Sequence, residues 1–310
     1  MVQEIMTPSV SVLMPAFNAE KYIAQAIKSI LQQSYSNFEL IVLNDGSTDR
    51  TKLILDEFTD ERIIKIHLDK NKGLVNARNQ LVNAARGKYI AFLDSDDIAR
   101  PQRLQLQVDF LDSGKADICG GTYDALYEIS GKMKSSKQRY LDGDIRALIS
   151  ICSPLCNPAV MGKAEAFKSH PYQTGKDYAE DYSLWAELAL AGYHFANLHD
   201  KLITYRIHHG QTSQVQNAAT NTIFNKSREE YLLGLGIAPD LNPRPMPFAD
   251  RLKSAIQFMV KLNQQIPGVS VWANYEIYAR FQFRGNGVLT PFTRLERLLV
   301  AIFASVQGRV

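Results

Sequence analysis

At residues 89–97 the chain reads YIAFLDSDD, an apolar run with strong β propensity that ends in three carboxylates within four residues. Folding alone does not call for this ending, because Asp94, Asp96 and Asp97 repel one another unless water or a bound cation lies between them. A strand that delivers carboxylates to its carboxyl end is typical of a site for a hard divalent cation and the phosphates it carries. The stretch therefore predicts a strand and a binding site together.

The sequence before this stretch alternates apolar strands with helical patterns. Strands are predicted at residues 10–14, 38–43, 63–68 and 89–93. Asn18 is the expected cap of the first helix, and Ser47 or Thr48 the expected cap of the second. Nearly all-apolar strands that alternate with helices indicate an α/β fold, with a mostly parallel central sheet and helices on both faces. Ligands of such sheets bind beyond the carboxyl ends of the strands.

The rest of the chain is less regular. Residues 124–142 are polar and rich in Lys and Ser, which favours an excursion or a flexible loop. Residues 193–198 and 202–207 look like two strands. The four prolines of residues 239–247 mark a boundary. We expect a catalytic domain at 1–213 (nucleotide-sugar half about 8–120, acceptor half about 121–213), a linker at 214–249 and a basic, amphipathic helical appendage at 250–310.

Composition excludes several classes of protein. A hydrophobic fraction of 45% and a charged fraction of 22% are ordinary for a soluble globular protein, and a net charge of +3 is too small to argue for nucleic acid. No run approaches the ~20 apolar residues of a membrane span, and no signal peptide is evident. The three cysteines lack metal-ligand spacing, so free thiols in a reducing cytoplasm are expected.

Two common phosphate-binding motifs are missing from the sequence. No Gly-x-Gly-x-x-Gly follows the first strand, and no Gly-x-x-x-x-Gly-Lys-Ser/Thr occurs, which disfavours dinucleotide oxidoreductases and ATPases. Phosphate charge would instead be neutralised by Mg²⁺ or Mn²⁺ held on carboxylates. A cation on a pyrophosphate also stabilises a phosphate leaving group. The expected substrate is a nucleoside diphosphate joined to a transferable group.

An ordered set of motifs resembles the family 2 glycosyltransferases with the GT-A fold. They are MPAFN at 14–18, NDGSTD at 44–49, GLVNARN at 73–79, LDSDD at 93–97, AEDYSLW at 179–185 and YRIHHGQTS at 205–213. The resemblance covers about residues 8–213. It implies a Rossmann-like nucleotide-sugar fold and an inverting, metal-dependent enzyme of the Asp-x-Asp type.

The resemblance also implies roles for individual residues. The nucleotide-sugar positions are Pro15, Phe17, Asn18, Asp45, Arg78, Asp94 and Ser95, and the metal positions are Asp96, Asp97 and His208. Asp45 would accept the uracil imide N–H, which favours uridine, and Arg78 would lie near the base or the diphosphate. Asp94 would face the ribose. His209 is an adjacent alternative to His208.

By the same resemblance Asp181 is the expected catalytic base, with Glu180 in reserve. A positioned carboxylate can take the proton of a sugar hydroxyl as it attacks the anomeric carbon, and attack opposite the diphosphate inverts the configuration. Each assignment has a structural alternative. Asp45 also suits a turn, Glu180 and Asp181 also suit the positive end of a helix dipole, and His208 could be a plain surface histidine.

We therefore expect an inverting transferase that moves a sugar from a UDP-sugar to a hydroxyl of a glycan or lipid-linked acceptor. Bacterial surface polysaccharide synthesis is the usual setting that the resemblance implies. One alternative is a nucleotidyltransferase that makes nucleotide sugars, which should carry an early Gly-rich, basic loop where residues 15–20 read PAFNAE. The other is a non-catalytic sugar-nucleotide-binding protein, against which the presence of both the Asp cluster and Asp181 argues. The sugar is expected to be selected within residues 122–157.

The carboxyl-terminal tail differs in charge from the rest. From 250 to 310 there are eight Lys or Arg and three Asp or Glu, a net charge of +5. An apolar stripe at helical spacing comprises Phe292, Leu295, Leu298, Leu299, Ile302, Phe303 and Val306. Such a stripe packs on the catalytic domain or on a second subunit in a homodimer, or it rests on an anionic membrane. The expected location is the cytoplasm, either free or at the inner face of the plasma membrane.

Overall fold

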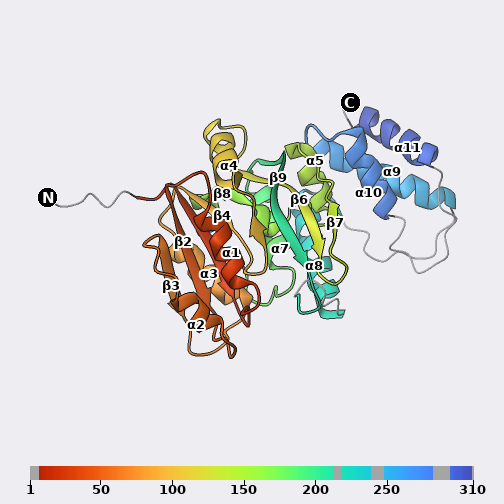
Figure 1. The fold of residues 1–310 in the computed structure, drawn as a ribbon. Helices are drawn as coiled ribbons and strands as arrows, with labels where there is room; N and C mark the ends of the chain where they lie inside the picture. Colours follow the sequence, from red (N-terminus) through yellow and green to blue (C-terminus); the bar gives the residue numbers. More distant parts are fainter. Residues whose placement is uncertain (1–6, 212–217, 239–247, 282–293, 309–310) are drawn as a thin grey trace.

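The computed structural model describes residues 7–211, 218–238, 248–281 and 294–308. The fold is α/β, as predicted, and its centre is a nine-stranded sheet in the order β3-β2-β1-β4-β8-β6-β9-β5, with β7 paired to β6 (Figure 1). The strands are β1 Val10–Ala16, β2 Phe38–Asn44, β3 Ile63–His67, β4 Tyr89–Phe92, β5 Ile98–Ala99, β6 Ile118–Tyr127, β7 Lys132–Ser135, β8 Met161–Lys163 and β9 Phe195–Ile207. The helices are α1 Ile23–Leu31, α2 Thr51–Asp56, α3 Leu74–Ala84, α4 Arg103–Asp112, α5 Asp142–Ile149, α6 Ala164–Ser169, α7 Glu180–Leu190, α8 Ala218–Gly234, α9 Phe248–Gln265, α10 Val271–Phe281 and α11 Arg294–Gln307.

The first four strands form a parallel layer, and all four were predicted. Val10 of β1 pairs with Phe38 of β2 and with Tyr89 of β4, so the carboxyl ends of these strands meet at one edge. Helices α1 and α4 contribute to the apolar core on one face of the sheet, and α3, α6 and α7 contribute to the core on the other. The loops that follow β1, β2 and β4 therefore lie close together at this edge of the sheet.

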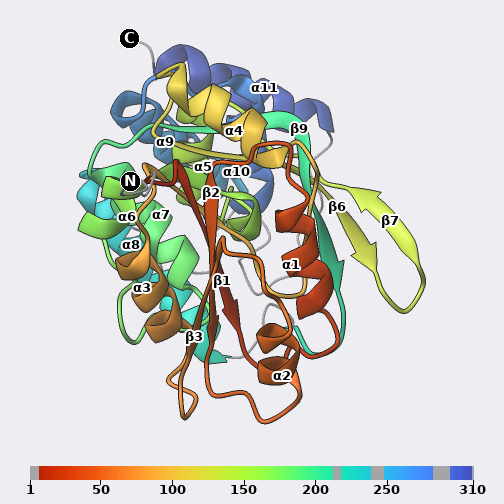
Figure 2. The same cartoon turned by 60° about the vertical axis from the view of Figure 1, so that its left-hand side comes forward.

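The second half of the sheet is mixed. Strand β8 is antiparallel to both β4 and β6, whereas β6 and β9 are parallel. Residues 124–142 were predicted to be an excursion or a flexible loop; the flexible loop was wrong, because this segment contains the end of β6 and all of β7, which form a projecting hairpin (Figure 2). Its polar composition reflects the full exposure of β7. The two strands predicted at 193–198 and 202–207 are one strand, β9, with register shifts near Gly121 and Thr122 of its partner.

The helix starts also differ from the predicted caps. Asn18 has a left-handed backbone (φ 49°) and α1 begins only at Ile23. The Asn18 Oδ1 instead accepts the Thr48 N–H at 2.9 Å, so it joins two loops rather than capping a helix. Neither Ser47 nor Thr48 caps α2; the N–H of Thr51, its first residue, is bonded to Asp49 Oδ1 at 2.9 Å.

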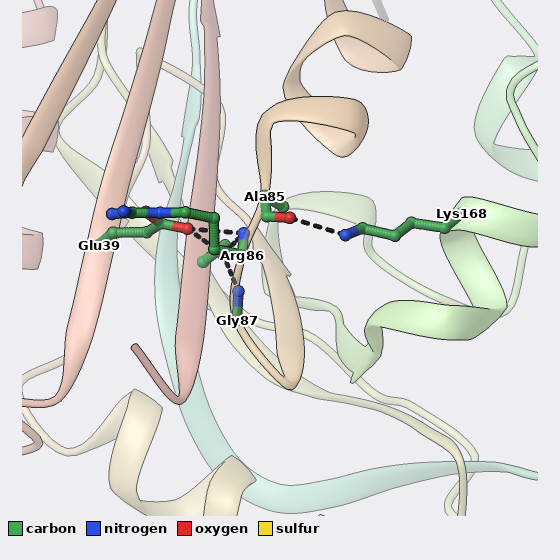
Figure 3. Close-up of polar contacts among 6 residues, drawn as sticks. Glu39, Ala85, Arg86, Gly87 and Lys168 are labelled. Atoms are coloured by element: carbon green, nitrogen blue, oxygen red, sulfur yellow. Dashed lines mark hydrogen bonds and ion pairs between the residues drawn. The ribbon is translucent and has the colours of Figure 1, made fainter. Parts of the chain in front are cut away.

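A polar clamp closes the amino end of the parallel layer (Figure 3). The buried Glu39 carboxylate of β2 accepts the Ser11 hydroxyl at 2.6 Å, the Arg86 N–H at 2.8 Å and the Arg86 guanidinium at 2.7 Å. Lys168 Nζ donates to the Ala85 carbonyl at 2.8 Å, at the carboxyl end of α3. These bonds satisfy polar groups that would otherwise be buried without partners, and they hold the α3–β4 connection at the opposite end from the binding edge.

The carboxyl-terminal helices pack beside α5, at the far end of the molecule from β3 (Figure 1). Helix α8 lies within the segment 214–249 that was predicted as a linker, and it packs on α7. Helix α11 buries small residues, Ala301 and Ala304, whereas Ile302, Phe303 and Val306 of the predicted stripe are 42%, 51% and 60% exposed. Phe292 of that stripe lies outside the described residues, as do Thr212 and Ser213 of the last motif. Of the helices described, none is long and apolar enough to cross a membrane.

Candidate active site

A cleft of about 1240 Å³ lies beyond the carboxyl ends of β1, β2 and β4 and extends between α7 and the β6–β7 hairpin. It gathers residues that are far apart in the sequence. The predicted site residues that line it are Pro15, Phe17, Asn18, Asp45, Arg78, Asp94, Ser95, Asp96, Glu180, Asp181 and His208. Asp97 lies behind the lining, 1% exposed, and His209 is exposed outside it.

The loops that follow β1, β2 and β3 form one end of the cleft. The Asp45 carboxylate is 3% exposed and accepts the N–H groups of Lys72 at 2.8 Å and Gly73 at 3.0 Å. Gly46 is required beside it, because its φ is +64° and a Cβ there would lie 2.3 Å from the carbonyl carbon of Lys70. Phe17 stands 48% exposed in the cleft wall, where a flat ligand can stack on it. Each Asp45 oxygen keeps a lone pair for a further donor.

The carboxylate cluster follows β4. One oxygen from each of Asp94, Asp96 and Asp97 lies within 4.8 Å of the others. Burial, partly offset by Arg78, raises the pKa of Asp94 to about 6, and the charge of Asp96 adds to the rise. Burial and the charges of Asp96 and Asp94 raise the pKa of Asp97 well above its usual range. The cluster therefore holds more negative charge than its protein surroundings neutralise.

This arrangement fits a divalent cation. Asp97 Oδ1 accepts the Arg206 N–H at 2.8 Å, whereas its buried Oδ2 has no hydrogen-bond partner among the described residues. An orphaned buried carboxylate oxygen beside two further carboxylates is the donor set that Mg²⁺ or Mn²⁺ prefers. Asp94 and Asp96 face the cleft and Asp97 does not, so Asp97 would reach such a cation only from behind.

His208, which follows strand β9, contacts this cluster. Its Nε2 lies 2.9 Å from Asp96 Oδ2, and its ring packs 4.7 Å from the ring of Tyr22. The Arg206 guanidinium donates to the Asp96 carbonyl at 2.8 Å and lies 4.7 Å from the Tyr22 ring. His208 was predicted to be a metal position together with Asp96 and Asp97, and the structure places it beside Asp96, whereas the neighbouring His209 lies outside the cleft.

Arg78 connects the Asp cluster to the carboxylates of α7. Its guanidinium forms a buried ion pair with Glu180 Oε1, and it lies 3.7 Å from Asp94 Oδ1. Burial opposes the charge of Arg78, but the attraction of Glu180, with that of Asp94 and Asp181, holds its pKa above the ordinary value. Sequence reasoning placed Arg78 near the ligand but did not find this pairing, because the helix-start position of Glu180 gives no sign of its partner.

Asp181 is the carboxylate of this pair left to face a ligand. The Asp181 carboxylate accepts the backbone N–H of Tyr182 at 2.6 Å, whereas the Glu180 carboxylate is paired with the Arg78 guanidinium. Burial, followed by the repulsion of Glu180, raises the pKa of Asp181 to about 6. A carboxylate with a pKa close to neutrality is better suited to accept a proton than one with the ordinary value. The geometry therefore favours Asp181 over Glu180 as a base.

Some contributing residues were not singled out from the sequence. Arg103 is completely buried, donates to the carbonyls of Phe92 at 2.7 Å and Val160 at 3.3 Å, and has its pKa lowered to about 10 by burial. Arg206 lies inside a motif that was quoted, so the signal was available. Tyr178 lines the cleft half exposed with a φ of 68°, and no sequence pattern indicated it.

Comparison with known proteins identifies relatives of this chain. The family model described as Glycosyl transferase family 2 matches residues 11–170. A Haemophilus influenzae protein described as an uncharacterized glycosyltransferase is 36% identical over 247 residues, which is 74% of this chain and 76% of that protein. The Escherichia coli UDP-Glc:alpha-D-GlcNAc-diphosphoundecaprenol beta-1,3-glucosyltransferase WfgD is 33% identical over 181 residues, 58% of this chain and 69% of that protein.

The fold also matches solved structures. The crystal structure of S. aureus TarS 1-349 in complex with UDP-GlcNAc superimposes with a TM-score of 0.62 and covers 97% of this chain and 91% of that one. The two sequences are 17% identical, so this likeness shows a shared fold.

Proposed function

The chain belongs to glycosyl transferase family 2, and from this premise we propose that it transfers a sugar from a UDP-sugar to a hydroxyl group of a glycan or lipid-linked acceptor, with inversion. One observation carries the proposal. Asp181, with a pKa of about 6, shares a cleft with the clustered carboxylates Asp94 and Asp96. A base and a phosphate-binding group on separate elements of one cleft are what this transfer requires.

In the proposed reaction the acceptor hydroxyl oxygen attacks the anomeric carbon of the donor. The new C–O bond forms as the bond between that carbon and the diphosphate oxygen breaks, and its electron pair leaves with UDP. The hydroxyl proton passes to a carboxylate oxygen of Asp181. Because attack comes from the side opposite the diphosphate, the configuration at the anomeric carbon is inverted.

The nucleotide is proposed to lie between the β1 and β2 loops. Phe17 offers a stacking surface, Pro15 and Asn18 complete the wall, and Asp45 would accept the uracil imide N–H. Asp94 and Ser95 would contact the ribose side. S. aureus TarS has been solved with UDP-GlcNAc and with UDP, which supports a nucleotide-sugar donor for a chain of the same fold.

Asp96 and His208, with Asp97 behind them, are proposed to hold Mn²⁺ or Mg²⁺. When bound, the cation would neutralise charge on the departing diphosphate. The protein's own contribution is to keep three carboxylates close together and to hold Asp97 through the Arg206 N–H.

The acceptor and its setting are also proposals. The relative WfgD is named for a diphosphoundecaprenol acceptor, and TuaG of Bacillus subtilis is named as a putative teichuronic acid biosynthesis enzyme. These names support a role in bacterial surface polysaccharide synthesis. The exposed Ile302, Phe303 and Val306 of α11 would support a peripheral membrane contact, or a homodimer through the same helix.

The test is UDP release with Mn²⁺ across a panel of nucleotide sugars and acceptors, with Asp181→Asn beside the wild type. The variant should bind UDP as the wild type does and lose transfer. A nucleotidyltransferase would instead release pyrophosphate from a nucleoside triphosphate, and a non-catalytic binding protein would bind UDP and turn over nothing. Undiminished transfer by Asp181→Asn would refute its role as the base.

A further inference from the structure

The β6–β7 hairpin forms a wall of the cleft away from the Asp cluster. Figure 2 shows the hairpin projecting from the body of the molecule beyond β9. Tyr123, Ala125 and Tyr127 of β6 line the cleft, and so do Lys134 of β7 and Lys137 just after it. The hairpin is therefore part of the site and not only a surface excursion.

The strand register explains how Lys134 reaches the cleft. Ala125 pairs with Lys134 and Tyr127 pairs with Lys132, and side chains of directly paired residues lie on the same face of a sheet. Since Ala125 and Tyr127 face the cleft, the same face carries the side chains of Lys132 and Lys134, and Lys137 lines the cleft from the segment that follows β7. The strand pairing thus places the positive charge of Lys134 in the same cleft that Asp94 and Asp96 line.

Lys134 and Lys137 differ from neighbouring cations because no described carboxylate is paired with them. Arg100 and Lys201 both pair with Asp124, at 2.9 and 2.8 Å, and Lys21 pairs with Glu128 at 2.7 Å. Within the part of the chain that the structure describes, no carboxylate lies within ion-pair distance of Lys134 or Lys137. Two unpaired cations on one wall attract an anionic ligand.

The donor's diphosphate is proposed to bind on the opposite wall, through a cation at Asp96 and His208. We propose that Lys134 and Lys137 form a second phosphate subsite, which binds a diphosphate group of the acceptor and presents the acceptor sugar to Asp181. This inference rests on the proposed function and specifies its acceptor as a diphosphate-linked sugar. Lysine suits the task because its ammonium group is a compact charge that binds phosphate without fixed geometry.

The tip of the hairpin indicates where this diphosphate comes from. Ile129 is 78% exposed at the tip, and Met133, which pairs with Leu126 on the face of the hairpin away from Lys134, is 55% exposed. Apolar side chains beside cations are typical of protein segments that meet the interface of an anionic or phosphate-bearing lipid layer. A lipid-borne diphosphate would place its charges on the lysines and its chain at the tip.

Binding of decyl diphosphate to the protein saturated with UDP and Mn²⁺ tests the subsite by calorimetry, because the donor site is then filled. We expect the wild type to bind it and the double variant Lys134→Gln/Lys137→Gln to bind it roughly tenfold or more weakly. Lys134→Arg/Lys137→Arg should retain binding. The matched control is Lys115→Gln/Lys261→Gln, two exposed lysines outside the cleft, which should bind as the wild type does.

Equal binding by the wild type and the glutamine variant would overturn the proposal. An equal loss of UDP affinity in that variant would also overturn it, because the lysines would then serve the donor. Inorganic pyrophosphate separates the sources, since a lipid-borne ligand predicts tighter binding of decyl diphosphate. Failure of the wild type to bind UDP would refute the proposed function instead, and decyl diphosphate titrated without UDP would still decide the subsite.

Discussion

Glu180→Gln should move the acidic limb of sugar transfer to lower pH. The pKa of Asp181 rises from an ordinary value of 3.8 to about 6, which corresponds to about 3 kcal/mol between its two protonation states. Burial is the largest cause of this rise, and the charge of Glu180 is the second. Glutamine keeps an oxygen that can accept from Arg78 but removes the charge that repels the Asp181 carboxylate.

Burial remains in the variant, but the Glu180 charge is lost and Arg78 still favours the ionised form of Asp181. A nearby charge of this kind shifts a pKa by on the order of one unit, so the limb should move by about one pH unit. The direction is fixed by the role of the base. Asp181 must be deprotonated to accept the hydroxyl proton, so a lower pKa keeps the enzyme active to lower pH.

The assay is the pH profile of kcat/KM for UDP release, measured beside the pH profile of UDP binding. The first profile should move further than the second, since Asp181 takes part in transfer and not in nucleotide binding, whereas the Glu180 charge is a smaller cause of the raised pKa of Asp94. Glu187→Gln is the matched control on the same helix, outside the cleft, and should leave the limb in place. An unmoved limb in folded Glu180→Gln, or an equal movement of the binding profile, would refute the reasoning about Asp181.

Three further outcomes are expected. Asp96→Asn should weaken Mn²⁺-dependent UDP binding roughly tenfold or more while leaving metal-free binding unchanged, as calorimetry with and without Mn²⁺ would show; equal loss in both would contradict a metal role. Glu39→Ala should lower the free energy of unfolding in urea by about 2–4 kcal/mol, because the Ser11 hydroxyl and the Arg86 N–H lose their acceptor, with UDP affinity unchanged. Ile302→Ser/Phe303→Ser/Val306→Ser should reduce co-sedimentation with anionic vesicles if α11 meets a membrane, and should change the sedimentation mass instead if it joins two subunits.

The parallel half of the fold could be predicted from sequence because its signals are local. Each of the strands β1 to β4 is a short apolar run with a turn or polar group at its carboxyl end, and that end is where parallel sheets bind ligands. The β6–β7 hairpin could not be predicted in the same way. Its second strand is exposed throughout, so burial imposes no alternation on residues 132–135, and only the pairing with β6 makes them a strand.

The candidate site, too, could be predicted only where its signals are local in the sequence. Asp94, Asp96 and Asp181 could be proposed from the sequence because a carboxylate cluster and a local motif are visible without tertiary contacts. Asp181 was preferred to Glu180 only by resemblance. The physical reason, the ion pair between Glu180 and Arg78, was not visible in the sequence because Arg78 reaches α7 from α3. The Asn18 side chain shows the limit most plainly. Its residue type suited a helix cap, but tertiary contacts placed its oxygen on the Thr48 N–H of another loop.

Arg78 also couples the proposed catalytic base to the carboxylate cluster that would hold the leaving group. The Arg78 guanidinium is paired with Glu180 and lies 3.7 Å from Asp94 Oδ1. Glu180 raises the pKa of Asp181, and Asp94 belongs to the carboxylate cluster that would hold the leaving group. Groups coupled through one buried charge do not titrate independently. A substitution at Asp94 should therefore alter the pH profile of transfer as well as donor binding. A substitution at Asp45, whose carboxylate accepts the backbone N–H groups of Lys72 and Gly73, should alter donor binding alone.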